Sequence, residues 1–157
     1  MGTINYVTGD ATQPEEEGNK IIVHICNDIG GWGKGFVLAI SKRWKEPEKA
    51  YRKWFSSKTL FRLGEVQFVK VEDDLWIANL IGQHKIRRDE EGNPPIRYDA
   101  IEIGLHKVVQ QAKDIDASVH MPRIGCGLAG GKWESIEPLI QNTLIKNNVK
   151  TIVYDFK

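Results

Sequence analysis

The chain has 157 residues, of which 41% are hydrophobic, enough for one compact domain with its own core and little more. We therefore expect a single domain over residues 1–157. Lysine and arginine together number 22 and aspartate and glutamate 21, so no global charge draws the chain to nucleic acid or to a membrane surface. An anionic ligand would have to be recognised by a local site.

Cysteine usage indicates a reduced protein. Cys26 and Cys126 are the only cysteines, and they are not in the spacing of metal ligands. No secretory or transmembrane pattern is present. We expect a cytoplasmic protein with two small buried cysteines, no metal, no bound cofactor and no membrane partner.

The first part of the chain predicts two strands, a glycine-rich loop and a helix. Residues 4–8 alternate like an edge strand and run into the turn Gly9-Asp10-Ala11-Thr12. Residues 20–26, K-I-I-V-H-I-C, form a continuous apolar run typical of a central strand covered on both faces. The loop N-D-I-G-G-W-G-K-G follows over residues 27–35, and helical spacing then predicts a helix over 36–44.

The middle of the chain predicts a helix, a hairpin and a loop. Residues 48–55 place Tyr51, Trp54 and Phe55 on one helical face, and the basic residues opposite them are interpreted as a solvated surface. Residues 64–71 and 75–81 are strand-like and are joined by a short acidic turn, which indicates an antiparallel hairpin. Residues 82–95 are rich in charge and end in Pro94-Pro95, which is typical of an exposed loop that could act as a lid.

The last part repeats the strand, loop and helix pattern. A long amphipathic helix begins near Tyr98, a short buried strand covers 118–121, a helix covers 133–147, and a last strand covers 151–154. The sequence G-C-G-L-A-G-G, over residues 125–131, lies between the strand at 118–121 and the helix at 133–147. Glycines let backbone N–H groups approach an anion, and a helix N-terminus favours negative charge.

Strands alternating with helices predict an α/β sheet with helices on both faces, whose ligands bind beyond the carboxyl ends of the strands. If the strands before the two glycine loops are parallel, the loops face each other across one crevice. Two facing phosphate loops suit a diphosphate better than a monophosphate.

Two familiar nucleotide motifs fit poorly. The G-x-G-x-x-G pattern of residues 125–130 matches the dinucleotide fingerprint, but only one helix and one strand follow it. A nicotinamide-dependent oxidoreductase therefore ranks last among the functions considered. Gly33-Lys34 is followed by Gly35 rather than by a hydroxyl residue, so the first loop is not a P-loop.

In combination, G-D-A at residues 9–11, V-H-I-C-N with G-G-W-G-K-G-F, and M-P-R-I-G-C-G-L-A-G-G-K-W resemble the macro domains. Members of that family bind ADP-ribose and often remove it from substrates. The resemblance spans nearly the whole chain and is closest to the branch of the ADP-ribose-1″-phosphate phosphatases and the terminal ADP-ribose glycohydrolase. It implies a three-layer α/β/α sandwich with a mixed sheet of about six strands.

The resemblance also implies an adenine site. Asp10 resembles the carboxylate that accepts the adenine amino group, with the Ala11 N–H beside it, and Tyr154 resembles the aromatic residue that stacks on adenine. An acceptor-only carboxylate can distinguish an amine from a carbonyl. The alternatives are a turn-forming Asp10 and a packed or surface Tyr154.

Asn27 resembles the asparagine that binds the distal ribose, and Gly31, Gly33 and Gly35 would pass close to the ribose and the diphosphate. Lys34 would add positive charge there or extend into solvent. The second loop would donate N–H groups to the phosphates from Gly125, Cys126, Gly127, Leu128, Ala129 and Gly130. Cys126 is interpreted as a packed residue, because no histidine adjoins it in sequence to make it a nucleophile.

Catalysis is where the chain departs from these relatives. The glycohydrolases use a lysine that attacks the anomeric carbon and an aspartate, and at the matching positions this chain has Gln83 and Ala129. Glutamine and alanine can neither form a Schiff base nor act as a base, although Lys85 lies nearby. The phosphatase-like members have a histidine at His24, a candidate acid or base acting with Asn27. The alternative is a His24 satisfied inside its strand.

Other candidates have weaker claims. His84, His106 and His120 rank below His24, and Asp28 could orient a water or cap its loop. The predicted function is hydrolysis of ADP-ribose-1″-phosphate or of ADP-ribosyl adducts, ahead of a non-catalytic ADP-ribose reader. The expected partners are ADP-ribose derivatives, with ADP-ribosylated macromolecules as an alternative and no strong direct binding of nucleic acid.

Overall fold

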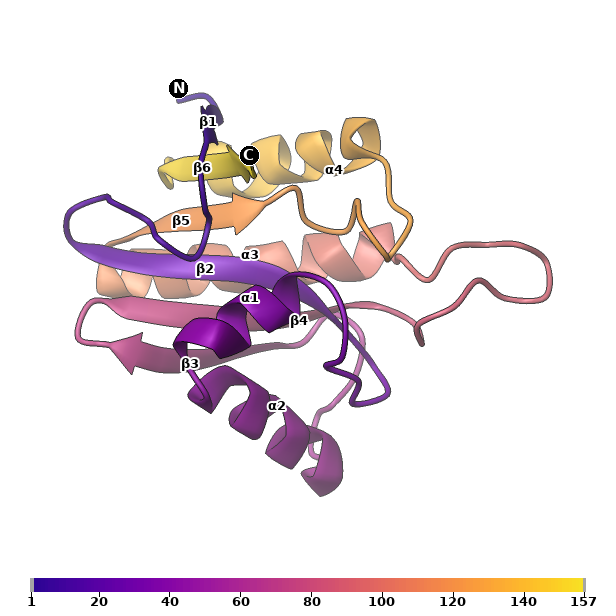
Figure 1. Ribbon diagram of the computed structural model, residues 1–157. Helices are drawn as coiled ribbons and strands as arrows, with labels where there is room; N and C mark the ends of the chain where they lie inside the picture. The colour runs from indigo at the N-terminus through magenta and orange to yellow at the C-terminus, as the bar shows by residue number, and fades with distance from the viewer. Residues whose placement is uncertain (1, 157) are drawn as a thin grey trace.

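The computed structural model describes residues 2–156 and contains one six-stranded sheet (Figure 1). Its strands are ordered β1-β6-β5-β2-β4-β3, and all neighbours are parallel except the antiparallel pair β3 and β4. The strands are β1 (Asn5–Thr8), β2 (Asn19–Asn27), β3 (Val66–Glu72), β4 (Leu75–Gln83), β5 (Ala117–Pro122) and β6 (Thr151–Asp155). The predicted mixed sheet, edge strand and hairpin are all confirmed.

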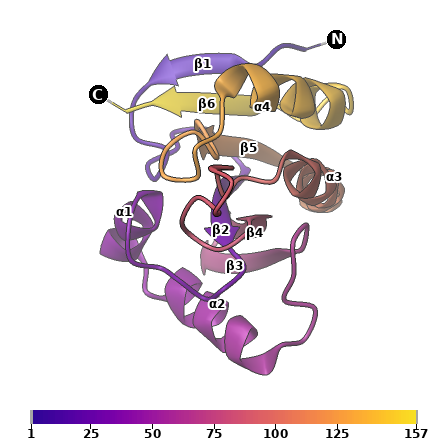
Figure 2. The same ribbon diagram turned by 90° about the vertical axis from the view of Figure 1, so that its right-hand side faces the viewer.

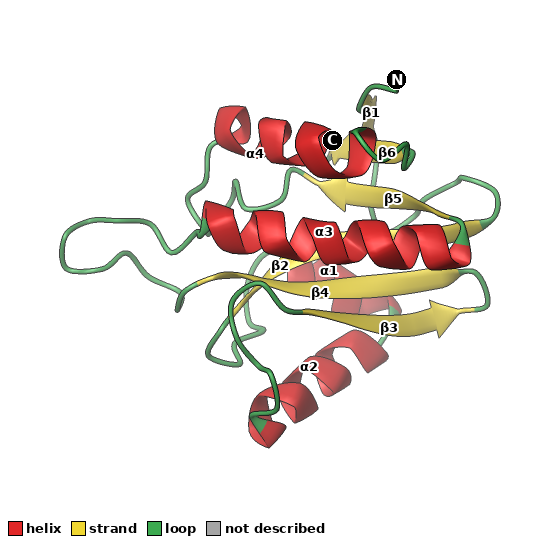
Figure 3. Cartoon of the chain, turned by 180° about the vertical axis from the view of Figure 1, so that it is seen from behind, coloured by secondary structure: helices red, strands yellow, loops and turns green. Residues whose placement is uncertain are grey.

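Helices cover both faces of the sheet, which gives three layers (Figure 2). α1 (Phe36–Arg43) and α2 (Glu46–Ser57) lie on one face. α3 (Tyr98–Ile115) and α4 (Trp133–Ile140) lie on the other, in front of the strands when the molecule is seen from behind (Figure 3). The predicted α/β/α sandwich is therefore confirmed.

β2 is the strand at the centre of this arrangement. Its residues alternate between two apolar clusters, with Ile21 and Val23 facing the α3 and α4 layer and Ile22 and Cys26 facing the α1 and α2 layer. All four side chains are at most 3% exposed. A strand buried on both faces needs an apolar residue at nearly every position, which is the pattern that predicted its central place.

Two predicted elements differ in detail. The helix expected over 133–147 is an α-helix only to Ile140 and then forms a π-helical turn, Gln141–Ile145. The loop expected over 82–95 begins with two residues of β4 and is closed at its base by a bridge between Gln83 and Ile96. Among residues 2–156, no helix has both the length and the apolar character that a membrane crossing requires.

Candidate functional site

A cleft of about 1200 Å³ lies at the carboxyl ends of the parallel strands. β2 and β5 are adjacent and parallel, so loop 1 (residues 27–35) and loop 2 (residues 123–132) leave the sheet at the same end of the strands. The loops lie close to each other at Gly35 and Leu128, because a Cβ atom built on Gly35 would lie 3.4 Å from Leu128 Cδ1. The prediction that they meet across one crevice is confirmed. The cleft lining includes Asn27, Gly31, Gly33, Lys34 and Leu128, and also Gln83, His84 and Lys85 after β4.

Loop 1 is organised by the side chain of Asn27, which is 8% exposed. Its Oδ1 accepts hydrogen bonds from the backbone N–H groups of Ile29 (3.0 Å) and Gly31 (2.9 Å). The one Tyr51 hydroxyl proton is shared between the Asn27 backbone carbonyl (2.6 Å) and Oδ1 (2.9 Å). Its Nδ2 donates to the Gly31 carbonyl at 2.9 Å. A primary amide has two N–H donors, so one Asn27 donor remains for a ligand.

Aromatic side chains pack against loop 1. Trp32 is 3% exposed, and its ring centroid lies 5.3 Å from that of Tyr51 and 5.4 Å from that of His24. Gly30 has φ +79°, and a Cβ atom there would lie 2.5 Å from the Phe55 ring. Beyond the loop, α1 begins at Phe36 after the N-cap residue Gly35, with no side-chain cap and no acidic residue in its first turn. Its N-terminal N–H groups therefore suit an anion.

Loop 2 is held by its own backbone. The Gly131 N–H donates to the Gly125 carbonyl at 2.7 Å, and a Cβ atom on Gly131 would lie 2.5 Å from that oxygen. Positive φ angles fall at Gly125 (+74°) and Gly130 (+77°). Gly127 has no positive φ, and a Cβ atom there meets nothing within 4 Å, so its backbone does not require glycine. Gly131, whose Cβ atom would meet a backbone oxygen, must also lack a side chain, and the sequence reasoning left it out of the site.

Cys126 and Ala129 of loop 2 both pack against the core, although Cys126 is partly buried rather than buried as predicted. Burial raises the pKa of the Cys126 thiol, which keeps it protonated, as a packed cysteine would be. Ala129 is 5% exposed, and its carbonyl accepts the Ile96 N–H at 3.1 Å. Loop 2 is thereby joined to the segment that follows β4.

That segment, the rim segment (residues 84–97), forms one wall of the cleft and projects from the sheet (Figure 1). At its base the His84 N–H donates to the Pro95 carbonyl (2.8 Å), and the Arg97 N–H donates to the Gly82 carbonyl (2.9 Å). The sequence predicted an exposed loop that could act as a lid, and the charged residues among 84–91 line the cleft. Lys85 is among them and has a left-handed backbone with φ +60°.

Asp10 and Tyr154 lie near each other at the carboxyl ends of β1 and β6, outside the lining of the large cleft. A Cβ atom on Gly9 would lie 3.7 Å from the Tyr154 ring, and Ala11 is 2% exposed. The Tyr154 hydroxyl pairs with His120 Nδ1 at 2.7 Å, and burial raises the pKa of Tyr154 to about 12.

The Asp10 carboxylate forms a local turn. Its Oδ1 accepts the Thr12 N–H at 2.8 Å and the Thr12 hydroxyl at 2.7 Å, and its Oδ2 lies 3.5 Å from the Arg43 guanidinium. Burial raises the pKa of Asp10, but these Thr12 and Arg43 contacts outweigh it and leave the pKa below its usual value. The carboxylate therefore stays ionised and able to accept a hydrogen bond.

His24 does not reach the cleft. It is 2% exposed, its Nε2 lies 2.5 Å from Asn79 Oδ1, and its ring packs edge-on against Trp32. Burial lowers the pKa of His24 to about 4. This placement does not support the predicted acid or base role and fits the alternative, a histidine satisfied inside its strand.

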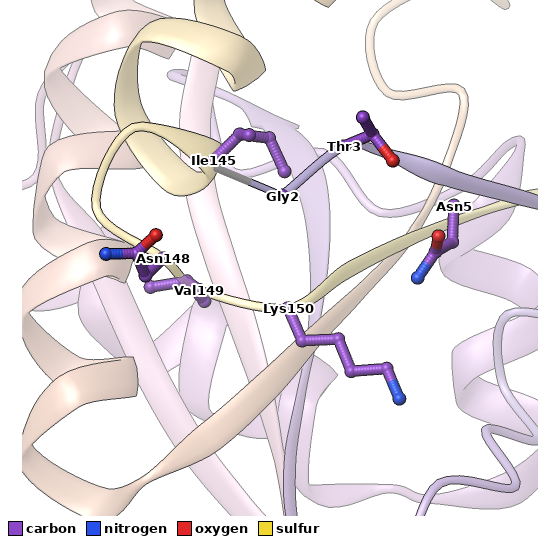
Figure 4. Close-up of a pocket in the computed structure, with 7 residues that line it drawn as sticks. All are labelled: Gly2, Thr3, Asn5, Ile145, Asn148, Val149 and Lys150. Atoms are coloured by element: carbon purple, nitrogen blue, oxygen red, sulfur yellow. The ribbon is translucent and has the colours of Figure 1, made fainter.

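A second pocket of about 390 Å³ lies at the opposite end of the strands, where β1 and β6 begin (Figure 4). Its lining consists of residues before β6 and around the start of β1. It brings together Gly2, Thr3, Asn5, Ile145, Asn148, Val149 and Lys150. None of these was predicted as a site residue, and the pocket lies apart from both glycine loops.

No family model matches the chain. A solved structure does: a macrodomain protein from Streptomyces coelicolor is 51% identical, with a TM-score of 0.87, and the match covers 97% of this chain and 98% of that one. The chain belongs to the macrodomain family.

Curated relatives of this macrodomain include the mouse chromodomain-helicase-DNA-binding protein 1-like, which is 36% identical over 164 residues. The match covers 98% of this chain but 18% of that protein, so the chain spans less than a fifth of its length. An ADP-ribose 1″-phosphate phosphatase from Meyerozyma guilliermondii is 22% identical, with 97% of this chain and 100% of that protein covered. A DNA ADP-ribosyl glycohydrolase from Mycobacterium tuberculosis is 26% identical, with 85% and 36% covered.

Proposed function

We propose that this macrodomain binds ADP-ribose and hydrolyses an ADP-ribose derivative, in the first place ADP-ribose-1″-phosphate. The observation that carries the proposal is the close approach of two glycine loops at one cleft, beside a helix N-terminus that has no side-chain cap. Such a site offers N–H donors to a diphosphate without placing side chains in its way. The names of the phosphatase and glycohydrolase relatives support the same ligand class.

In this proposal, Asp10, the Ala11 N–H and Tyr154 hold the adenine at the carboxyl ends of β1 and β6. The diphosphate lies between loop 2 and Gly31–Gly35, with Lys34 as the added positive charge. Asn27 donates its remaining N–H to the distal ribose. All of these groups are at the carboxyl ends of the parallel strands β1, β6, β5 and β2.

The phosphate ester ranks ahead of macromolecular adducts because of two substitutions. Gln83 and Ala129 stand where glycohydrolases of this branch have a lysine and an aspartate, so a lysine-based covalent mechanism lacks its two groups. Lys85 lines the same cleft. We expect weak or no activity on ADP-ribosylated proteins and DNA.

A non-catalytic reader is the second candidate, because every binding group named above would serve it equally well. The observation that favours it is the burial of His24, which removes the acid or base first expected to act. Phosphate release by the purified protein separates the two functions.

The binding half of the proposal is tested by titration calorimetry with ADP-ribose and, separately, with NAD. We expect 1:1 binding of ADP-ribose, and Asp10→Ala should weaken it by roughly 1–3 kcal/mol through loss of a charged hydrogen bond. Asp73→Ala, at an exposed turn position, is the matched control. Equal affinity of the wild type and Asp10→Ala would remove Asp10 from the site, and preference for NAD would favour the oxidoreductase.

A further inference from the structure

Asp28 and His84 form a carboxylate–imidazole pair at the cleft, with Asp28 Oδ2 2.7 Å from His84 Nδ1. The residues are 56 apart in sequence, one after β2 and one after β4, which are adjacent parallel strands. The His84 side chain is 45% exposed and lines the cleft, while the Asp28 side chain is 15% exposed. The pair therefore has a sheltered acid and an accessible imidazole.

The hydrogen bonds around the pair fix its orientation. An ionised carboxylate only accepts hydrogen bonds, so His84 donates from Nδ1. The other oxygen, Asp28 Oδ1, accepts the Lys85 N–H at 2.7 Å, which prevents the carboxylate from turning. The His84 N–H is bonded to the Pro95 carbonyl, so both the backbone and the ring of His84 are held. In the neutral ring, Nε2 then carries the lone pair.

His84 differs from His24 in the property that matters for proton transfer. The Nε2 of His24 is bonded to Asn79 in the core, whereas the Asp28 carboxylate holds the opposite nitrogen of His84. His84 shares its cleft with Asn27, the residue that precedes Asp28. A base must be within reach of the proton that it removes, and of these two imidazoles His84 is the one at the cleft.

We propose that His84 is the general base that releases phosphate from ADP-ribose-1″-phosphate and that Asp28 is its positioning residue; this inference rests on the proposed function. His84 Nε2 accepts a proton from a water whose oxygen forms a bond to phosphorus. The bond from phosphorus to the 1″ oxygen breaks, its electron pair stays on that oxygen, and that oxygen takes a proton from solvent water on the far side of phosphorus, while the imidazolium gives its own proton back to the solvent. The products are ADP-ribose and inorganic phosphate.

Other charged groups line the cleft beside this pair. On loop 1 the charged residue in the lining is Lys34. On the rim segment they are the charged side chains of residues 85–91 and Arg97. Both signs are present, so a single variant must be compared with the wild type at each pH rather than with an isolated imidazole.

The experiment uses three variants and two measurements. His84→Asn keeps a side-chain N–H that can donate to Asp28 but has no group that accepts a proton, so it preserves the connection between the loops and removes the base. Asp28→Asn still accepts the Lys85 N–H but presents a donor to His84, which forces the proton onto Nε2. His106→Asn, on the exposed side of α3, is the matched control. The measurements are ADP-ribose affinity by calorimetry and the pH profile of kcat for phosphate release.

We expect His84→Asn to bind ADP-ribose like the wild type while kcat falls roughly 10²–10⁴-fold. Asp28→Asn should lower kcat roughly tenfold or more, and His106→Asn should change neither quantity. Protonation stops a base from accepting the water proton, so the residual rate of His84→Asn should have a smaller fall of kcat toward acid than the wild type.

Wild-type kcat in His84→Asn, or an unchanged acid limb in that variant, would overturn the proposal and leave the pair as a structural contact between the two segments. A wild-type protein that binds ADP-ribose but releases no phosphate would refute hydrolysis itself, and with it the base. In that case the calorimetry still decides the binding half of the proposed function. The two failures are therefore distinguishable.

Discussion

The two glycine loops of this macrodomain occupy equivalent places, each after a parallel strand and before a helix, yet different forces hold them. Loop 1 depends on a side chain, because four hydrogen bonds join Asn27 to its own loop and to Tyr51. Loop 2 depends on the lack of side chains, because the Gly131 and Gly125 backbones are in direct contact. Similar glycine patterns therefore predict different responses to substitution.

The strands before the loops are more alike than the loops themselves. β2 buries His24 and β5 buries His120, and the register that pairs Ile22 with His120 places both histidines on the same face of the sheet. Each imidazole is bonded to a neutral partner, Asn79 for one and Tyr154 for the other. Acid should therefore destabilise both units in the same way.

The largest expected effect is this acid destabilisation. Burial lowers the pKa of both His24 and His120 to about 4, against 6.5 for a histidine in the unfolded chain. Between those values the unfolded chain binds protons that the folded chain does not, so stability is full above about pH 6.5 and is lost as the pH falls toward 4. Each histidine should remove roughly 3 kcal/mol from the free energy of unfolding over this window.

Urea denaturation at stepped pH values measures this loss. His24→Gln, whose amide can still donate to Asn79, should remove about half of the slope without touching the β5 unit. A slope that is unchanged in His24→Gln would show that His24 is not one of the titrating groups.

The next effect breaks loop 1 alone. Asn27→Ala removes the acceptor shared by the Ile29 and Gly31 N–H groups, while Tyr51 keeps the backbone carbonyl of residue 27, and we expect it to lower the free energy of unfolding by about 3 kcal/mol. ADP-ribose binding should be lost in the same variant. Thermal unfolding and calorimetry measure both, with Asn5→Ala on the exposed edge strand as the control. Full stability in Asn27→Ala would mean that the aromatic support is sufficient for loop 1.

A smaller effect should break loop 2 alone. Gly131→Ala places a Cβ atom 2.5 Å from the Gly125 carbonyl oxygen, a backbone atom that can move only with the loop. We expect a loss of about 2 kcal/mol in the free energy of unfolding. Gly127→Ala, whose Cβ atom meets open space, is the control and should remain within about 0.5 kcal/mol of the wild type. Denaturant midpoints that coincide for the two variants would refute this account of loop 2.

The smallest expected effect compares the two loops directly, because each loop has one glycine with open space at its Cβ position. These are Gly33 in loop 1 and Gly127 in loop 2, and neither has a positive φ. Gly33→Val and Gly127→Val should both fold normally and weaken ADP-ribose binding by about tenfold or more, or about 1.4 kcal/mol, through steric exclusion of the phosphates. A variant that folds and binds like the wild type would remove its loop from the diphosphate site.

Much of the fold was predictable because it depends on local pattern. The apolar run of β2 requires burial on both faces, and helical spacing defined α1, α2 and α3 to within a few residues. The end of the last helix was less predictable, since the change to π-helical geometry at Gln141 leaves no clear mark in the sequence. The rim segment is exposed over residues 84–93 as predicted, but Pro95 and Ile96 are buried, and the bridge between Gln83 and Ile96 joins residues that show no strand pattern together.

By itself the sequence determined where the glycine loops occur, that a strand precedes each and a helix follows it, and which family the motifs resemble. Only the tertiary structure decided which layer covers each face of β2, and with it the burial of His24 beneath Trp32. Residue alternation reports that His24 and Cys26 share a face, but not which helices cover that face. Likewise, Asp28 and His84 meet only because β2 and β4 are neighbours in the sheet, and strand order is set by the packing of the whole chain rather than by either segment.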